Sequence, residues 1–439
     1  MIAQNIINKN FIVNFIISLI PISYICGNLI LNLNIIILIL CAFLFFGKQI
    51  FGGKLNIIDK LILLLFIYIF FNGLLNNFLN FSFPEAPNQN IVLIKSLFYL
   101  RFIILYFILK FLIENDLINY KLIFFAFGSC SLFVSGDVIF QYIFGKDIFG
   151  FEGTSRKLSG PFGDEEIAGS FVQRFFIFFP YALLFFIKFK KPWTYQLFFL
   201  FTLALCLFGT LLSGNRIPLF LFIIILGMIF IYQKQLRVTL LILSVIFVTT
   251  FSYLSSINEN FKIHYINNFI DKSIKILDYT KIRISTGKID DYANTHIKEI
   301  ESGILTIQKN KSFGGGIKSF YFNCSSVENP VMKRYGGNNC NMHPHNYYIE
   351  IATALGLVGL LLIFLILATT IFYALKQIHN SNNSIDKKKL LIPFFIIFIV
   401  EIFPFKTTGS FFTTTNATFL FIIISFVVGL SEIKKTKKS

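Results

Sequence analysis

Two histidines close a long polar segment of this sequence, at the point where an apolar run begins. His343 and His345 flank Pro344, Asn346 follows, and the apolar run extends from there to about residue 375. A run of that length is enough to cross a bilayer, so we expect His345 to lie at a helix start, at the membrane boundary. A histidine in that place can act as a general base near neutral pH. The alternative is a pair of interfacial histidines that caps an ordinary transmembrane helix.

Two glycines follow His345 along the same expected helix. Gly356 comes eleven positions after His345, and Gly359 comes about one turn later. At helical periodicity these residues lie near one face. Because small residues let a second helix approach closely, the spacing predicts a tight helix contact close to the histidine.

The complete pattern is His345-Asn346, nine residues, and then Gly-Leu-Val-Gly ending at Gly359. It resembles the signature of the O-antigen ligase and O-antigen polymerase superfamily of bacterial membrane glycosyltransferases. Residues 160–165 (Gly-Pro-Phe-Gly-Asp-Glu) and the glycines 314–316 are also similar to segments of that superfamily. The resemblance implies that His345 is the base that activates the acceptor hydroxyl and that Asn346 orients it.

The arginines are few, and therefore informative. Only seven of the 39 basic residues are arginine, and Arg101, Arg174 and Arg216 lie within or at the ends of apolar runs. A charge in that position is costly unless it is paired or functional, and guanidinium groups suit diphosphate oxygens. We expect Arg216, which resembles an arginine of the superfamily, and Arg174 to bind a diphosphate, with His343 and Arg101 completing the substrate site. For Arg101 the alternative is a structural ion pair with Asp137 in the neighbouring span.

The composition excludes an ordinary soluble protein. Hydrophobic residues make up 55% of the 439 positions, 59 residues are Phe, and the mean hydropathy is +0.72. These values predict an all-α polytopic membrane protein in which residues 1–439 form one integral membrane domain. About twelve apolar runs are long enough to cross the bilayer: 11–26, 28–47, 61–79, 93–113, 120–144, 167–188, 193–212, 216–232, 237–254, 347–375, 390–405 and 411–430.

Lysines mark the expected orientation. They cluster in alternate short connections and in tail residues 434–438, which places both chain ends in the cytoplasm. The net charge of +17 is then an orientation and anionic-lipid signal rather than a sign of nucleic-acid binding. Residues 255–345 fall on the periplasmic side as one large loop between helices 9 and 10. Within it, isoleucines at helical spacing over residues 292–309 predict an amphipathic helix lying against the membrane face.

Two cysteines of this loop, Cys324 and Cys340, have fifteen residues between them. An oxidising periplasm permits a disulfide there, which would tether the chain just before His343. The alternative is metal ligation by Cys340, His343 and His345. The acids at 164–166 offer a second possible cation site, although such acids also simply favour a helix start. We expect neither a metal nor another cofactor.

The resemblance implies a GT-C-like fold in a bacterial inner membrane and an inverting glycosyl transfer. The donor would be a glycan on undecaprenyl diphosphate, and the arginines would stabilise the departing diphosphate without a metal. The acceptor would be lipid A-core for a ligase or another lipid-linked repeat unit for a polymerase, and the nine-residue spacing favours the ligase. A different alternative is a secondary transporter or flippase whose path is lined by Arg101, Asp137, Arg174 and Glu401. Against it, the sequence has no two-halves repeat, and its polar residues collect at one face.

Overall fold

The computed structural model describes residues 2–78, 89–154, 156–271, 274, 277–278, 281, 295–324, 342–380, 385–406 and 409–432. Within them every regular element is a helix, and a β-bridge joins Lys146 to Glu152. The first half contains α1 (Ile2–Ser18), α2 (Ile20–Ile25), α3 (Asn28–Phe46), η1 (Gly47–Phe51), α4 (Ile57–Phe78), α5 (Gln89–Tyr99), α6 (Arg101–Glu114), α7 (Tyr120–Phe144), η2 (Gly160–Phe162), α8 (Ala168–Phe175), α9 (Phe178–Phe186) and α10 (Pro192–Leu212). The second half contains α11 (Arg216–Tyr232), η3 (Lys234–Leu236), α12 (Arg237–Ile257), α13 (Glu259–Lys262), η4 (Ile263–Asn267), α15 (Thr295–Lys309), α16 (Ser319–Asn323), α18 (Tyr347–His379), α19 (Ile385–Glu401) and α20 (Thr414–Glu432).

The all-α polytopic membrane fold is confirmed. In the described ranges, nine helices are long and apolar enough to cross a membrane, and two shorter apolar helices cover Lys9–Ile25 and Arg216–Tyr232. The expected run 390–405 corresponds to α19, which has 17 residues. The count of twelve spans stays a prediction.

Local sequence signals explain several helix boundaries. Asn119 caps α7 by accepting a hydrogen bond from the backbone N–H of Leu122. At the other end of α7, Gly145 adopts φ 81°, the left-handed conformation that ends helices. Gly27, at φ 97°, separates α2 from α3 in the same way. At these three boundaries a capping asparagine or a glycine therefore marks where the helix begins or ends.

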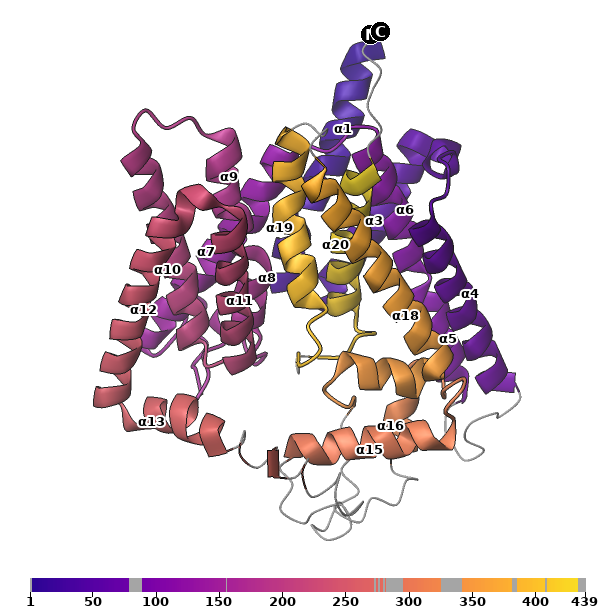
Figure 1. The fold of residues 1–439 in the computed structure, drawn as a ribbon. Helices are drawn as coiled ribbons and strands as arrows, with labels where there is room; N and C mark the ends of the chain where they lie inside the picture. Colours follow the sequence, from indigo (N-terminus) through magenta and orange to yellow (C-terminus); the bar gives the residue numbers. More distant parts are fainter. Residues whose placement is uncertain are drawn as a thin grey trace.

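Helix α20 forms the centre of the bundle (Figure 1). All residues from Asn416 to Leu430 are buried, and they pack against α6, α18 and α19. Close approach elsewhere depends on small residues: a Cβ on Gly128 of α7 would lie 2.4 Å from the backbone nitrogen of Phe179. Leu44 and Val245, by contrast, are 78% and 63% exposed, as lipid-facing side chains would be.

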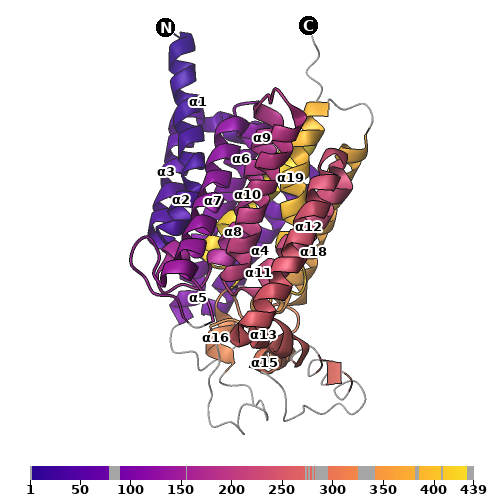
Figure 2. The same cartoon turned by 90° about the vertical axis from the view of Figure 1, so that its left-hand side faces the viewer.

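The two ends of the bundle differ. Helices α13, α15 and α16 lie at one end, and the start of α1 and the end of α20 lie at the other (Figures 1 and 2). We call the first the outer end. At the opposite end, Lys110 of α6 is buried in an ion cluster with Asp59, Glu114 and Glu432, which ties α4, α6 and α20 together. The chain ends and the expected periplasmic loop therefore lie on opposite faces, as the lysine pattern predicts.

The expected amphipathic helix is α15, which lies across the outer end (Figure 1). Its polar face, not its isoleucine stripe, packs against the rest of the protein: Glu299, Ser302 and Thr306 are buried, whereas Ile304 is 37% exposed. Ile300 and Ile307 are half-buried, so the polar face fixes the helix to the bundle and the isoleucines lie at its edge or in the open.

The predicted ion pair between Arg101 and Asp137 is wrong. Arg101 Nη1 donates to the carbonyl of Phe98, and Nη2 donates to Thr414 at the start of α20. Asp137 instead accepts a hydrogen bond from the backbone N–H of Ile148, 2.9 Å away, and so holds the loop that follows α7. One oxygen of the carboxylate has this local backbone partner, the other is buried without a hydrogen bond, and Arg101 is bound to Phe98 and Thr414 instead.

Candidate functional site

The histidine motif is a short, constrained turn at the outer end. Pro344 is buried, and His345 has φ 49°, a backbone conformation that residues other than glycine rarely adopt. Asn346 then caps α18, because its Oδ1 accepts hydrogen bonds from the N–H groups of Tyr348 and Ile349 at 3.0 and 3.2 Å. Strained residues of this kind cluster at functional sites.

A carboxylate and a second imidazole adjoin His345. Glu299 of α15 is 3% exposed, and its Oε2 lies 3.7 Å from His345 Nε2. The ring of His343 lies 4.4 Å from that of His345, centroid to centroid. Burial, together with the nearby His345 and Lys318, lowers the pKa of His343 to about 4, so this imidazole is neutral at physiological pH. The arrangement is therefore a histidine beside a buried carboxylate, with a neutral histidine packed against it at an interplanar angle of 56°.

Below the motif, α18 is kinked at Gly356, which has φ 63° and ψ −170°. The segment that follows α15 docks on this kink: the N–H groups of Gly315 and Gly316 donate to the carbonyls of Thr353 and Ala354. A Cβ on Gly356 would lie 2.2 Å from the carbonyl oxygen of Ser312, so only glycine fits. The expected close contact at this glycine is real, but a loop makes it rather than a second helix. The glycines 314–316 thus fix the outer loop to α18.

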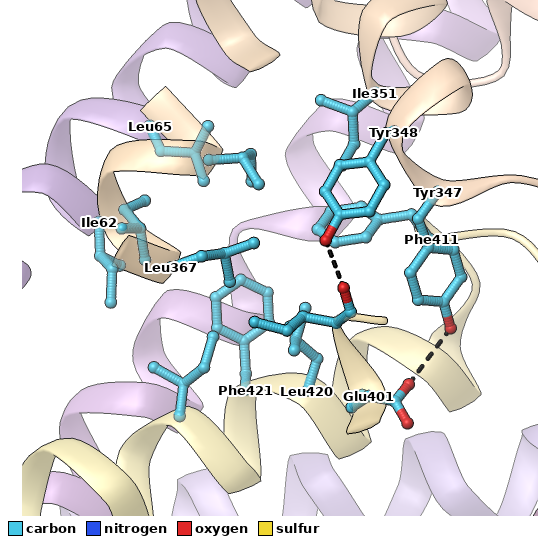
Figure 3. A pocket seen from close by; sticks show the side chains of 14 residues that line it. Ile62, Leu65, Tyr347, Tyr348, Ile351, Leu367, Glu401, Phe411, Leu420 and Phe421 are labelled. Carbon is cyan, nitrogen blue, oxygen red and sulfur yellow. Dashed lines mark hydrogen bonds between the residues drawn. The ribbon is translucent and has the colours of Figure 1, made fainter. Parts of the chain in front are cut away.

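The connection between α19 and α20 packs on the other side of the motif. Asn346 Nδ2 donates to the carbonyl of Pro404 at 2.8 Å. The hydroxyl of Tyr348 donates to the backbone carbonyl of Ile402 (Figure 3). Tyr347 donates to Glu401 at 3.3 Å and, with Tyr348, lines a small apolar cavity of about 20 Å³ between α4, α18 and α20 (Figure 3). The side-chain amide of Asn346 is thus engaged in the helix cap and in the contact with Pro404. Asn346 therefore positions the neighbouring His345 through the backbone.

Arg216 begins α11 at the outer end, in a second polar region. Its Nη1 donates to the carbonyl of His264 at 3.3 Å, and His264 Nε2 lies 2.9 Å from the carbonyl oxygen of Gly214. Burial lowers the pKa of His264, and the positive charges of Arg216, Lys157 and Arg156 lower it further. Four basic side chains therefore gather here from three segments of the chain.

A cavity of about 430 Å³ opens beside this cluster. It lies between the end of α7, the loop that follows it and η4. Its polar lining consists of Tyr142, Thr154, Arg156, Lys157, Asn258, Asn260, His264, Tyr265 and Asn268. Amide, hydroxyl and cationic groups together suit an anionic or sugar-bearing ligand.

The connection between α19 and α20 contacts both the histidine motif and the Arg216 region. Phe220, one turn after Arg216, packs against Phe403 with ring centroids 5.9 Å apart. The next residue, Pro404, accepts the hydrogen bond from Asn346. The connection between α19 and α20 therefore links the start of α11 to the start of α18.

A family model described as O-antigen ligase matches residues 201–364. The match runs from α10 through the second polar region and the outer helices to α18, and it includes both Arg216 and His345. It supports membership of the chain in the O-antigen ligase superfamily. It also supports an O-antigen ligase or polymerase type of function for this multi-pass membrane protein, rather than transport. Comparison with curated proteins finds no match.

Arg174, the other arginine expected to bind the donor, is buried. It is 6% exposed, and its Nη2 donates to Glu401 at 2.8 Å and to Asn416 at 2.6 Å. Lys406 forms a second ion pair with Glu401 at 2.5 Å. The guanidinium group of Arg174, which was expected to bind a phosphate, thus pairs with the carboxylate of Glu401. Arg174 thereby ties α8 to α19 and α20.

The cation alternatives find no support in the described ranges. No group of three or more His, Cys, Asp or Glu side chains there is arranged to hold a metal ion. Glu166 is paired with Lys157 at 2.6 Å. Cys324 is disulfide-bonded, while Cys340 lies outside the described residues, so their pairing stays a prediction.

Sequence reasoning missed three residues that the structure brings to these sites: Glu299, His264 and Arg156. Arg156 carried a signal, as one of only seven arginines. Glu299 and His264 carried none, because each lies in a polar loop segment and meets its partners only through the fold.

Proposed function

We propose that this protein is an O-antigen ligase-type glycosyltransferase of the bacterial inner membrane. It moves a glycan from undecaprenyl diphosphate to lipid A-core, or to a similar acceptor, on the periplasmic face. His345 removes the proton from the acceptor hydroxyl as that oxygen attacks the first sugar carbon. The bond from this carbon to the diphosphate breaks, and Arg216 stabilises the charge on the leaving group without a metal.

The observation that carries the proposal is the setting of His345 within the matched segment. It lies at the outer end in a strained conformation, beside a buried carboxylate. The turn is held by α15, through the close approach of Gly303 to Pro344, and by the connection between α19 and α20, while residues 311–316 fix the same helix below the turn, at Gly356. Such preorganisation is what a base that works on a bound hydroxyl requires.

Arg216 supports the donor side of the proposal. It lies at the same end of the bundle, next to three further basic side chains and a polar cavity. A diphosphate is the kind of group that such a cluster attracts. Arg174 has no part in this step, because its guanidinium is held by Glu401.

The test is a purified transfer assay with lipid-linked donor and lipid A-core acceptor. His345→Ala should still fold and bind the donor, but transfer should fall about 10²- to 10⁴-fold, the contribution of a general base. His379→Ala is the matched control, because His379 is exposed at the opposite end of the same helix. Full activity of His345→Ala would overturn the mechanism. Product on a second lipid-linked unit instead of lipid A-core would make the protein a polymerase.

A further inference from the structure

We infer that Glu299 is the positioning residue for His345, holding the imidazole in one orientation and tautomer and stabilising it once it is protonated. This inference rests on the proposed role of His345 as a base. The carboxylate oxygen lies 3.7 Å from Nε2, within ion-pair reach and slightly beyond a direct hydrogen bond. Catalytic hydrogen bonds are often long before substrate binds, so this distance suits a pair that tightens as the imidazole gains charge.

The position of Glu299 is fixed by packing. Gly303 lies one turn later on the same face of α15, and a Cβ there would be 2.4 Å from Ile349 and 3.4 Å from Pro344. A larger residue would lift α15 away from the histidine motif. The absence of a side chain at 303 thus sets the distance between Glu299 and His345, residues from different parts of the chain.

The electrostatics suit this role. A carboxylate facing Nε2 favours the tautomer that is protonated there, so the acceptor's proton goes to Nδ1. The negative charge also stabilises the imidazolium that forms when the ring takes the acceptor's proton. The other titratable groups nearby are His343, which packs against His345 and is neutral at physiological pH, and Lys318, whose positive charge reaches His343. Lys318 opposes the imidazolium, so Glu299 supplies the favourable charge.

Because the proposed role of Glu299 depends on its negative charge, the pH dependence of transfer is the decisive measurement. Glu299→Gln keeps the shape and removes the charge, so the base should become weaker. The turnover number should fall about 10-fold or more with little change in acceptor KM, as for other groups that orient a catalytic histidine. The acid limb of the pH profile should move to lower pH, because the imidazolium loses its stabilising charge.

Two variants and a double mutant complete the test. Glu299→Asp should recover part of the rate and the wild-type position of the acid limb. Glu259→Gln, an exposed carboxylate on the outer helix α13, should change neither. Adding Glu299→Gln to His345→Ala should cost no further activity. An acid limb that stays at its wild-type pH in a folded Glu299→Gln protein would overturn the inference even if the rate falls. Full activity of His345→Ala would instead overturn the proposed function, so the two failures are distinguishable.

Discussion

Arg174 and Arg216 are two arginines of similar sequence setting with opposite surroundings. Both lie near the outer end of an apolar helix in a chain that favours lysine. Arg174 is buried against a carboxylate that a second cation, Lys406, also contacts. Arg216 is half-buried, donates to a backbone carbonyl and stands among other basic groups.

These surroundings indicate a structural charge at Arg174 and a charge that is available to a ligand at Arg216. A buried guanidinium needs a fixed partner, and Glu401 meets that need for Arg174 within the fold. Around Arg216, Arg156 and Lys157 add positive charge; Glu166 pairs with Lys157, and the charge of the two arginines favours an anionic ligand. The same residue type therefore stabilises the bundle in one region and prepares a site in the other.

The largest expected effect is on the stability of the Arg174 region. Glu401→Gln leaves Arg174 and Lys406 buried side by side without their carboxylate. We expect a loss of about 3 kcal/mol in unfolding free energy, near the lower end for a broken buried pair because Lys406 can shed its proton. Arg174→Gln should cost less, since Lys406 still pairs with Glu401. Thermal unfolding of the detergent-solubilised variants measures both, and equal losses would contradict this account of the cluster.

Arg216 should show the reverse behaviour. Arg216→Lys keeps the charge but loses the planar fork, so we expect transfer to fall about 10²-fold with nearly unchanged thermal stability. The transfer assay and thermal unfolding of the same preparation test this together. A variant that unfolds early and regains its activity when stabilised would place Arg216 with Arg174 as a structural residue.

The contrast also shows what the sequence could reveal. Span lengths, helix ends and the turn at His345 depend on neighbouring residues, so the all-α fold and the motif were predictable from hydropathy and spacing. Partners depend on distant contacts: Glu401 lies 227 positions from Arg174, and the Asp137 carboxylate found a backbone group rather than Arg101. Depth in an apolar run indicates that a charge needs a partner, but it does not say which one.

A smaller effect is expected from substitution of Gly214, which lets the loop that carries Arg156 lie close to Arg216. Gly214 has φ 74°, and a Cβ there would lie 2.2 Å from the carbonyl oxygen of Arg156. Gly214→Ala should therefore displace this loop and weaken donor binding about 10-fold, the loss of one charged contact. Gly227→Ala, at a position with open space, is the matched control. Donor titration measures the effect, and unchanged affinity would exclude Arg156 from the site.

The smallest effect is a pH dependence confined to the Arg174 region. Burial lowers the pKa of Lys406 to about 7, whereas an unfolded lysine keeps its proton to about pH 10.4. Between these values the unfolded chain binds more protons, so stability should rise with pH. We expect a gain of about 1 kcal/mol in unfolding free energy from about pH 6.5 to about pH 7.8.

Lys406→Met should abolish that rise, and Arg216→Lys should leave it intact. The Arg216 region has a dependence of the same sign in a lower pH window. Because the pKa of His264 is lowered, its contribution is complete above about pH 6.5, the ordinary histidine value, and is lost only as the pH falls below it. Thermal unfolding measured across pH 5 to 9 therefore separates the two regions. A rise above pH 7 that survives in Lys406→Met would assign it to another group and remove Lys406 from the account of the buried cluster.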